Sequence, residues 1–214
     1  MTGRTVVLMG GGGFGTFARD LAVFAGWEPA GILDNNLSKG TLVNGCPVLG
    51  DLNLLEDAAL REKHHFIASI QKPSLRRDWS RRVLALGGRL ATIIHPSVAR
   101  SPSAAVGAGV MINAFSFAYA NARVGDFCIV ESHCSVGTEV EVGECSMLAP
   151  GVLVNRAARI GDECFVGSGA VLNPDVVVGR NCLIGANATV VKNLPDNVVA
   201  AGSPARILRE NSIS

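Results

Sequence analysis

A six-residue repeat runs from Val106 to Thr189 without a break in register, and it constrains the fold more than any other feature of the chain. The first place of each repeat holds Val, Ile or Leu, except at Ala118. The fifth place is always small or β-branched, and the second is often Gly. A period of six matches neither the 3.6 residues of a helix nor the two of a strand. The repeat therefore predicts a β-solenoid.

We expect each repeat to form one short strand and one corner, so that three repeats close one triangular coil. First-place aliphatic side chains should stack inside the coil, and small fifth-place residues should fit its narrow interior. Glycine at the second place should permit a tight corner. Because one repeat cannot bury its own apolar face, stability must come from the stacking of neighbouring coils.

Composition bounds the class of protein. The chain has 214 residues, of which 48% are hydrophobic, and its formal net charge is +1. This length allows a sizeable core and two domains. A near-neutral chain carries no electrostatic footprint for nucleic acid or an anionic membrane, so neither partner is expected. The apolar run from Thr5 to Met9 is too short for a signal peptide or a membrane span, which predicts a cytoplasmic protein without membrane insertion.

Cysteine placement argues against metal and disulfide chemistry. Four of the six cysteines occupy the fifth place of a repeat, and none belongs to a CxxC motif. There they should behave as small buried hydrophobic residues. These four are Cys128, Cys134, Cys164 and Cys182, whereas Cys46 and Cys145 have no partner that the sequence identifies. No metal site is predicted.

The N-terminal part reads as half of a dinucleotide-binding unit. Residues 5–9 form a short apolar run that opens onto a glycine loop, residues 16–25 read as a helix, and residues 29–33 lead to Asp34. The GxGxxG pattern within the loop is formed by Gly10, Gly12 and Gly15. In such a unit, loop N–H groups and the helix N-terminus hold a phosphate. A tight turn without a ligand is the alternative.

Further elements follow before the repeats begin. Residues 40–50 suggest a loop and a short strand, residues 52–62 a helix, and residues 64–70 another strand. A basic helix is expected over residues 73–86, followed by a strand-like run at 90–94. Its arginines could form an anion site, but a solvated helix face is the interpretation we favour. These arginines are Arg76, Arg77, Arg81 and Arg82.

Four spaced segments resemble the sialic-acid and bacillosamine type of sugar O- or N-acyltransferase. They read VVLMGGGGFGTFA, GILDNN, IIHPSV and AAGSPARIL, and together with the repeats they span the whole chain. The resemblance implies an α/β Rossmann-like nucleotide-sugar-binding domain over residues 1–92. It implies a left-handed parallel β-helix with acyltransferase activity and a C-terminal tail over residues 93–214. The left hand, which departs from the usual right-handed crossover, is taken from the resemblance alone.

The resemblance also implies a reaction and its binding sites. Family members transfer an acetyl group from acetyl-CoA to an amine or hydroxyl of a sugar, usually nucleotide-linked, at a site between the subunits of a homotrimer. The phosphate loop and the base or ribose pocket would involve Gly11, Gly12, Gly13, Asp34, Asn35 and Gly50. The coenzyme would lie along the coils near Met147, Ser168, Gly185 and Ala186, with its phosphates within reach of Lys192 and Arg206.

The chain departs from the family at the catalytic base. Matching the repeats places the family's catalytic His on Thr138, the acid that follows it on Glu139, and a second His on Met147. The loop also has Phe14 and Thr16 where the family commonly has His and Lys. Thr cannot act as a general base near neutral pH, and base catalysis typically contributes about 10²- to 10⁴-fold.

Three explanations of the missing base remain open. An amine could bind as the free base, so that positioning supplies most of the acceleration, with Glu139 as an accessory. Glu139 or His133 could instead replace the base, or activity could be lost. We favour the first, which places N-acetylation ahead of O-acetylation. For His133, in the fourth place of its repeat, a surface residue at a corner is the interpretation we favour. Glu131, which replaces a family Asn, could bind a cationic amine or be an exposed charge.

Other functional classes fit less well. A γ-type carbonic anhydrase needs a cluster of zinc-binding histidines, but the repeats hold only His133 beyond His95 at their start. An NAD-dependent oxidoreductase is disfavoured because no dehydrogenase-like domain follows the small α/β unit. A catalytically impaired binding protein stays open. We therefore predict a homotrimeric, acetyl-CoA-dependent N-acetyltransferase for a nucleotide-linked amino sugar in bacterial surface-glycan biosynthesis.

Overall fold

The computed structural model describes residues 4–212. The chain forms two compact units, and the division falls between Pro96 and Ser97. Strand β7 (Ile93–Ile94) comes before this division in the chain and is the terminal strand of a solenoid sheet. Among the described residues, no helix has the length and apolarity to cross a membrane.

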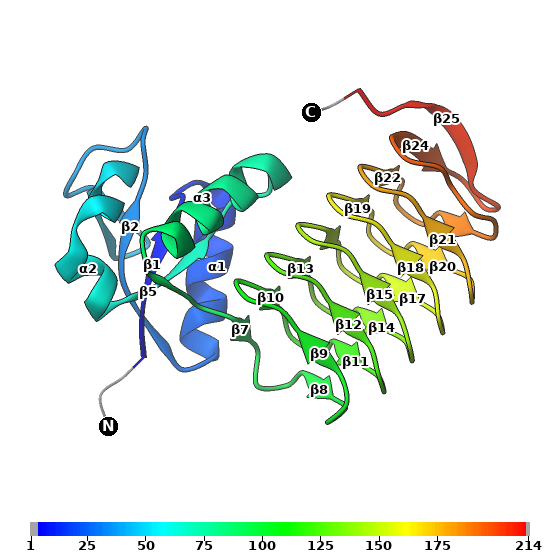
Figure 1. The fold of residues 1–214 in the computed structure, drawn as a ribbon, viewed down its shortest axis with the longest axis horizontal. Coiled ribbons are helices and arrows are strands. Elements are labelled where there is room, and N and C mark those ends of the chain that lie inside the picture. The colour runs from blue at the N-terminus through cyan, green and yellow to red at the C-terminus, as the bar shows by residue number, and fades with distance from the viewer. Residues whose placement is uncertain (1–3, 213–214) are drawn as a thin grey trace. The chain divides into compact units, whose positions relative to one another are not determined.

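The first unit is a mainly parallel sheet with helices, as expected for a Rossmann-like domain. Its strands lie in the order β3-β4-β2-β1-β5-β6, so β1 is flanked by β2 and β5 (Figure 1). Among the described strands of this sheet, only β3 is antiparallel to its neighbour. The strands are β1 (Arg4–Met9), β2 (Trp27–Leu33), β3 (Leu42–Val43), β4 (Cys46–Gly50), β5 (His65–Ala68) and β6 (Arg89–Leu90). The α-helices are α1 (Gly13–Phe24), α2 (Ala58–Lys63) and α3 (Pro73–Ala85).

The prediction of a single helix over residues 52–62 is wrong. The segment contains a 3₁₀-helix, Leu52–Glu56, and then α2, with Asp57 between them in an extended conformation (φ −72°, ψ 110°). The Asp57 carboxylate accepts hydrogen bonds from the N–H groups of Ala59 (2.9 Å) and Leu60 (3.4 Å). Asp is a favoured N-cap residue, and here it ends one helix and starts the next.

The second unit is a prism of parallel coils with three flat sheets, which confirms the solenoid and the fold class (Figure 1). Face 1 contains β7, β10 (Met111–Ile112), β13 (Ile129–Val130), β16 (Met147–Leu148), β19 (Phe165–Val166) and β22 (Leu183–Ile184). Face 2 contains β8 (Ala99–Arg100), β11 (Phe117–Ala118), β14 (Ser135–Val136), β17 (Leu153–Val154), β20 (Val171–Leu172) and β23 (Thr189–Val190). Face 3 contains β9 (Ala105–Val106), β12 (Arg123–Val124), β15 (Glu141–Val142), β18 (Arg159–Ile160) and β21 (Val177–Val178).

The C-terminal segment extends face 1. Strand β24 (Val198–Ala201) pairs in parallel with β22, and β25 (Arg206–Glu210) returns antiparallel to β24. What the sequence suggested was a tail is therefore the outermost pair of strands of a sheet. All five residues of β25 are exposed.

The second-place glycines begin the corners but do not supply their left-handed residue, contrary to the prediction that they permit the tight turn. The left-handed residue is in the fourth place of the repeat, for example at His133 and Glu139, which both have φ near 59°. At Gly125, a Cβ would lie 2.9 Å from the Val142 carbonyl oxygen in the next coil. Second-place glycines are thus required by the close approach of successive coils, not by the turn itself.

Fifth-place hydroxyl and thiol groups form ladders inside the prism. The Ser146 hydroxyl donates to the Gly161 carbonyl (2.8 Å) and accepts from the Cys164 N–H (3.0 Å). The Cys164 thiol donates in turn to the Gly179 carbonyl (3.0 Å). All six cysteines are buried, and burial raises the pKa of the Cys134 thiol to about 11. Fifth-place cysteines are confirmed as interior residues that also satisfy buried carbonyl groups.

Replacing Ser146 with Ala is expected to lower the free energy of unfolding by about 2 kcal/mol, because two buried backbone groups lose their partner. Urea unfolding of the two proteins measures the difference. Ser135→Ala is the matched control, since Ser135 lies half-buried on the outer side of β14 and should change stability by less than about 0.5 kcal/mol. Equal effects of the two substitutions would show that the ladder contributes no stability of its own.

Candidate functional site

The glycine loop packs tightly at its two ends and is open in the middle. Gly10 has φ 110°, and a Cβ there would lie 2.9 Å from the Ser69 carbonyl oxygen. A Cβ on Gly15 would overlap the Gly10 carbonyl oxygen. Gly12 and Gly13, in contrast, have nothing within 4 Å of a built Cβ. The outer glycines therefore hold the strand, loop and helix together, while the inner ones leave space for a ligand.

A cavity of about 610 Å³ lies beside the open part of the loop. It is bounded by the start of α1, the end of β2, the loop after β5 and the start of α3, and its lining residues include Gly12, Gly13, Phe14, Asp34, Asn35, Ser69, Lys72 and Trp79. Gly12 is the N-cap of α1 and has no side chain to occupy the N–H groups of the first turn. Such unused N–H groups form a ready site for an anion.

The carboxylate at the end of β2 is held by backbone groups. One Asp34 oxygen accepts from the Gly11 N–H (2.7 Å), and the other accepts from the N–H groups of Asn36 (2.8 Å) and Leu37 (3.2 Å). The Gly11 N–H is therefore directed to Asp34, and Gly11 does not line the cavity. Asp34 is a fixed acceptor at the cavity wall, suited to a hydroxyl donor such as a ribose.

Asn35 is oriented by a neighbouring loop. Its Oδ1 accepts from the Leu52 N–H (3.1 Å), so its NH₂ group is the part that stays available to a ligand. Gly50 lines a second hollow, of about 460 Å³, together with Asp34 and Asn35. The predicted nucleotide residues thus lie along two adjoining hollows in one unit, with Gly11 as a supporting residue behind them.

Arg76 is buried, whereas a solvated helix face was predicted for it. Its side chain is buried, with 1% of the residue exposed, and it donates to the carbonyl groups of Ile70 (3.0 Å) and Gln71 (2.7 Å). The residues of α3 that are buried are Arg76, Ser80 and Val83, spaced as one helical face. That spacing was the signal that could have distinguished Arg76 from the other arginines, and Arg82 does pair at the surface with Glu56 (3.0 Å).

The predicted acyl-transfer residues lie along two corners of the prism. Corner 1, which follows the strands of face 1, carries Glu131, His133, Ser168, Gly185 and Ala186. Corner 2, which follows the strands of face 2, carries Thr138, Glu139 and Lys192. Met147 lies on β16 and is buried, and Arg206 lies on β25 and is exposed. A single chain therefore does not bring the two groups of residues together.

The titratable side chains of the corners differ in exposure. Glu139 and His133 are exposed, and the His133 ring lies 5.1 Å from the Phe115 ring, between centroids, in the preceding coil. Glu131 is half-buried, and burial raises the pKa of its carboxyl group. A cationic amine beside Glu131 would offset this desolvation.

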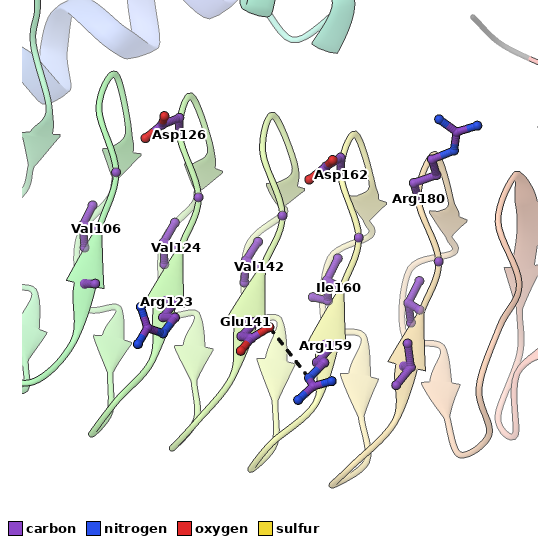
Figure 2. Close-up of a pocket in the computed structure, with 18 of the residues that line it drawn as sticks. Val106, Arg123, Val124, Asp126, Glu141, Val142, Arg159, Ile160, Asp162 and Arg180 are labelled. Atoms are coloured by element: carbon purple, nitrogen blue, oxygen red, sulfur yellow. Dashed lines mark ion pairs between the residues drawn. The ribbon is translucent and has the colours of Figure 1, made fainter.

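A larger hollow, of about 710 Å³, lies along face 3 and contains none of the predicted residues (Figure 2). Figure 2 shows Arg123, Glu141 and Arg159 in a row across successive coils, with Glu141 and Arg159 paired at 3.7 Å. Positive and negative side chains alternate along the hollow, so it does not present a ligand with a cluster of charges of one sign. We therefore place the candidate site in the α/β unit and on corners 1 and 2.

An α/β unit with an open glycine loop, followed by a triangular prism of hexapeptide coils, defines a hexapeptide-repeat transferase. Comparison with protein families matches residues 5–83 to the PglD N-terminal domain and residues 157–192 to the bacterial transferase hexapeptide repeat. A comparison with curated protein sequences gave no match.

Solved structures are similar over the whole chain. PerB from Caulobacter crescentus, in complex with CoA and GDP-perosamine, is 32% identical with a TM-score of 0.89, over 98% of this chain and 99% of that one. A histidine-to-asparagine mutant of perosamine N-acetyltransferase from the same organism, with the same ligands, is 30% identical with a TM-score of 0.92, over 98% and 99%. The acetyltransferase domain of PglB from Neisseria gonorrhoeae, in complex with acetyl coenzyme A, is 29% identical with a TM-score of 0.89, over 96% and 100%. The chain belongs to the bacillosamine-type family of hexapeptide-repeat sugar acyltransferases.

Proposed function

We propose that the protein is an acetyl-CoA-dependent N-acetyltransferase that acts on a nucleotide-linked amino sugar in surface-glycan biosynthesis. The observation that carries this proposal is the 32% identity, over nearly the full length of both chains, to PerB bound to CoA and GDP-perosamine. The sugar amine attacks the thioester carbonyl carbon, the carbon–sulfur bond breaks, and the products are the sugar acetamide and CoA with a free thiol. The amine loses one proton and the departing sulfur gains one.

Corner 1 offers backbone groups to the coenzyme. Among the hydrogen bonds of the described residues, none uses the N–H of Ser168 or Ala186, which occupy equivalent places in successive coils. On corner 3, which follows the strands of face 3, the equivalent N–H groups of Ala108 and Glu144 are taken by the carboxylates of Asp126 and Asp162. Pantetheine amides can pair with free N–H groups of this kind, much as a peptide pairs with a sheet edge.

Lys192 lies on corner 2, three coils beyond Thr138, or about 14 Å along the prism. Lys192 is exposed, and we expect its ammonium to meet the coenzyme phosphates while the thioester lies near Thr138. Arg206, exposed on β25, is the second cation assigned to these phosphates.

Positioning of a neutral amine supplies most of the acceleration in this proposal, because Thr138 cannot accept a proton near neutral pH. Glu139 assists as an accessory base.

Glu139→Gln is expected to lower turnover by about tenfold, less than the 10²- to 10⁴-fold of a full general base, and to change the pH profile. A steady-state comparison with His133→Gln as the control measures this. Unchanged turnover together with an unchanged pH profile would remove Glu139 from the mechanism.

A homotrimer would complete the site, because corners 1 and 2 of one chain lie on different edges of the prism. Face 2 exposes 39% of Phe117 and 43% of Leu153, as a face that packs against a second copy would in the free chain. Cyclic assembly would bring corner 2 of one copy to corner 1 of the next.

Sedimentation at micromolar concentration is expected to show a trimer, and a monomer would contradict this part of the proposal. Cytoplasmic residence also remains a prediction.

The reaction is tested by release of the CoA thiol from acetyl-CoA. Nucleotide-linked 3- and 4-amino sugars serve as acceptors, and their hydroxyl counterparts are the matched controls. Turnover with an amine alone is the expected result. Turnover with a hydroxyl sugar would favour an O-acetyltransferase, and binding of acetyl-CoA without turnover on any acceptor would favour a non-catalytic binding protein.

A further inference from the structure

The cavity beside the glycine loop has one cationic side chain in its lining, that of Lys72. The loop and the first turn of α1, from Gly10 to Thr16, contain no Lys, Arg or His. The N-terminus of a helix is equivalent to only about half a positive charge. A further cation in the cavity wall would therefore strengthen the binding of a diphosphate at this helix.

Lys72 lines the same cavity as the glycine loop, at the end of a segment fixed by hydrogen bonds. It is the N-cap of α3, in an extended conformation (φ −61°, ψ 115°), and Pro73 follows it at the first helical position. The two residues before it are fixed by the buried Arg76 guanidinium, which binds the carbonyl groups of Ile70 and Gln71. Earlier in the same loop, the Ser69 hydroxyl lies within hydrogen-bond distance of the Gly10 carbonyl (2.7 Å). The backbone that leads to Lys72 is thus anchored, and its exposed side chain forms part of the cavity lining.

The charge of the cavity adds a second argument. Asp34 also lines it, and its carboxylate accepts hydrogen bonds from three backbone N–H groups. An anionic ligand must therefore tolerate a negative group in the same cavity. The lysine ammonium of the same lining supplies the compensating positive charge and up to three hydrogen-bond donors.

We propose that Lys72 binds the diphosphate of the nucleotide-linked sugar, together with the N–H groups at the start of α1, and that it thereby selects nucleotide-linked sugars over free sugars. The assignment rests on the proposed function, since it needs a nucleotide in the α/β unit. Loss of one charge-assisted contact is expected to weaken binding of a nucleoside diphosphate by about 10- to 100-fold.

Calorimetric titration of the full-length protein with UDP, GDP and dTDP tests the assignment. Lys72→Gln is expected to weaken the diphosphate that binds best by about 10- to 100-fold, to reduce the salt dependence of its binding, and to leave acetyl-CoA binding unchanged. Lys72→Arg should retain most of the affinity. Lys63→Gln is the matched control, because Lys63 is exposed at the end of α2 and lies outside the cavity lining.

The outcomes separate two failures. Equal diphosphate affinities of the wild type and Lys72→Gln overturn the role of Lys72 but leave the proposed function intact. A wild-type protein that binds acetyl-CoA but none of the diphosphates overturns both the role of Lys72 and the nucleotide-linked substrate. Thermal unfolding of each variant checks that the fold is retained, and Lys72→Arg keeps the comparison valid if Lys72→Gln is unstable.

Discussion

Gly12→Asp is expected to abolish binding of the nucleotide-linked sugar while the fold stays intact. Gly12 has φ −69° and ψ −168°, a conformation that any residue adopts, and a Cβ there meets nothing within 4 Å. Asp is also a favoured N-cap, so α1 should be slightly stabilised. Its carboxylate would occupy the N–H groups that the phosphate needs and would repel the phosphate itself. Like charges brought together at a binding site cost several kcal/mol, which predicts a loss of about 10²-fold or more in kcat/KM.

Steady-state kinetics and thermal unfolding of Gly12→Asp measure the two effects separately. Gly12→Ala is the matched control, since it adds only a methyl group in open space and brings no charge. A Gly12→Asp protein with wild-type kcat/KM for its nucleotide-linked acceptor would show that no anionic group binds at the start of α1.

Gly15→Ala is expected to have the largest effect on stability. The added Cβ would overlap the Gly10 carbonyl oxygen, and Gly10 itself packs so closely that a Cβ there would lie 2.9 Å from the Ser69 carbonyl oxygen. Because both contacts involve backbone, no side chain can rotate away, and we expect the free energy of unfolding to fall by about 3 kcal/mol. Urea unfolding measures the change.

Gly13→Ala is the control for Gly15→Ala, because it adds the same methyl group within the same helix. Its Cβ would meet nothing within 4 Å, and Ala favours a helix over Gly by up to about 1 kcal/mol. Equal stabilities of Gly13→Ala and Gly15→Ala would contradict the close packing of α1 against the glycine loop.

The repeat register was readable from the sequence because one periodicity determines which side chains face inward. It correctly places the fifth-place cysteines in the interior, and its period of three repeats puts Ser168 and Ala186 on one corner. The role of the second-place glycines was not readable in the same way. Their requirement arises from the distance between successive coils, as the contact of Gly125 with Val142 shows, and a linear pattern carries no such distance.

Two errors in the α/β unit have a similar origin. Residues 52–62 are rich in helix-forming residues, but the Asp57 carboxylate competes for the backbone N–H groups and divides the segment. Arg76 was read as solvated because its neighbours are charged, whereas its partners are carbonyl groups of the preceding loop. The cavity that joins Lys72 and Trp79 to the glycine loop depends on β5 lying beside β1, which local sequence does not encode.

The central claim is the transfer of acetyl from CoA to a sugar amine, and mass spectrometry of the sugar product tests it most directly. The protein is incubated with acetyl-CoA and a nucleotide-linked amino sugar, and the product is then exposed to mild base, which cleaves an acetyl ester but not an amide. We predict an acetylated nucleotide sugar that survives the base treatment and is absent when the hydroxyl counterpart replaces the amine. An acetyl group lost in base, or acetylation of the hydroxyl counterpart alone, would contradict the assignment as an N-acetyltransferase.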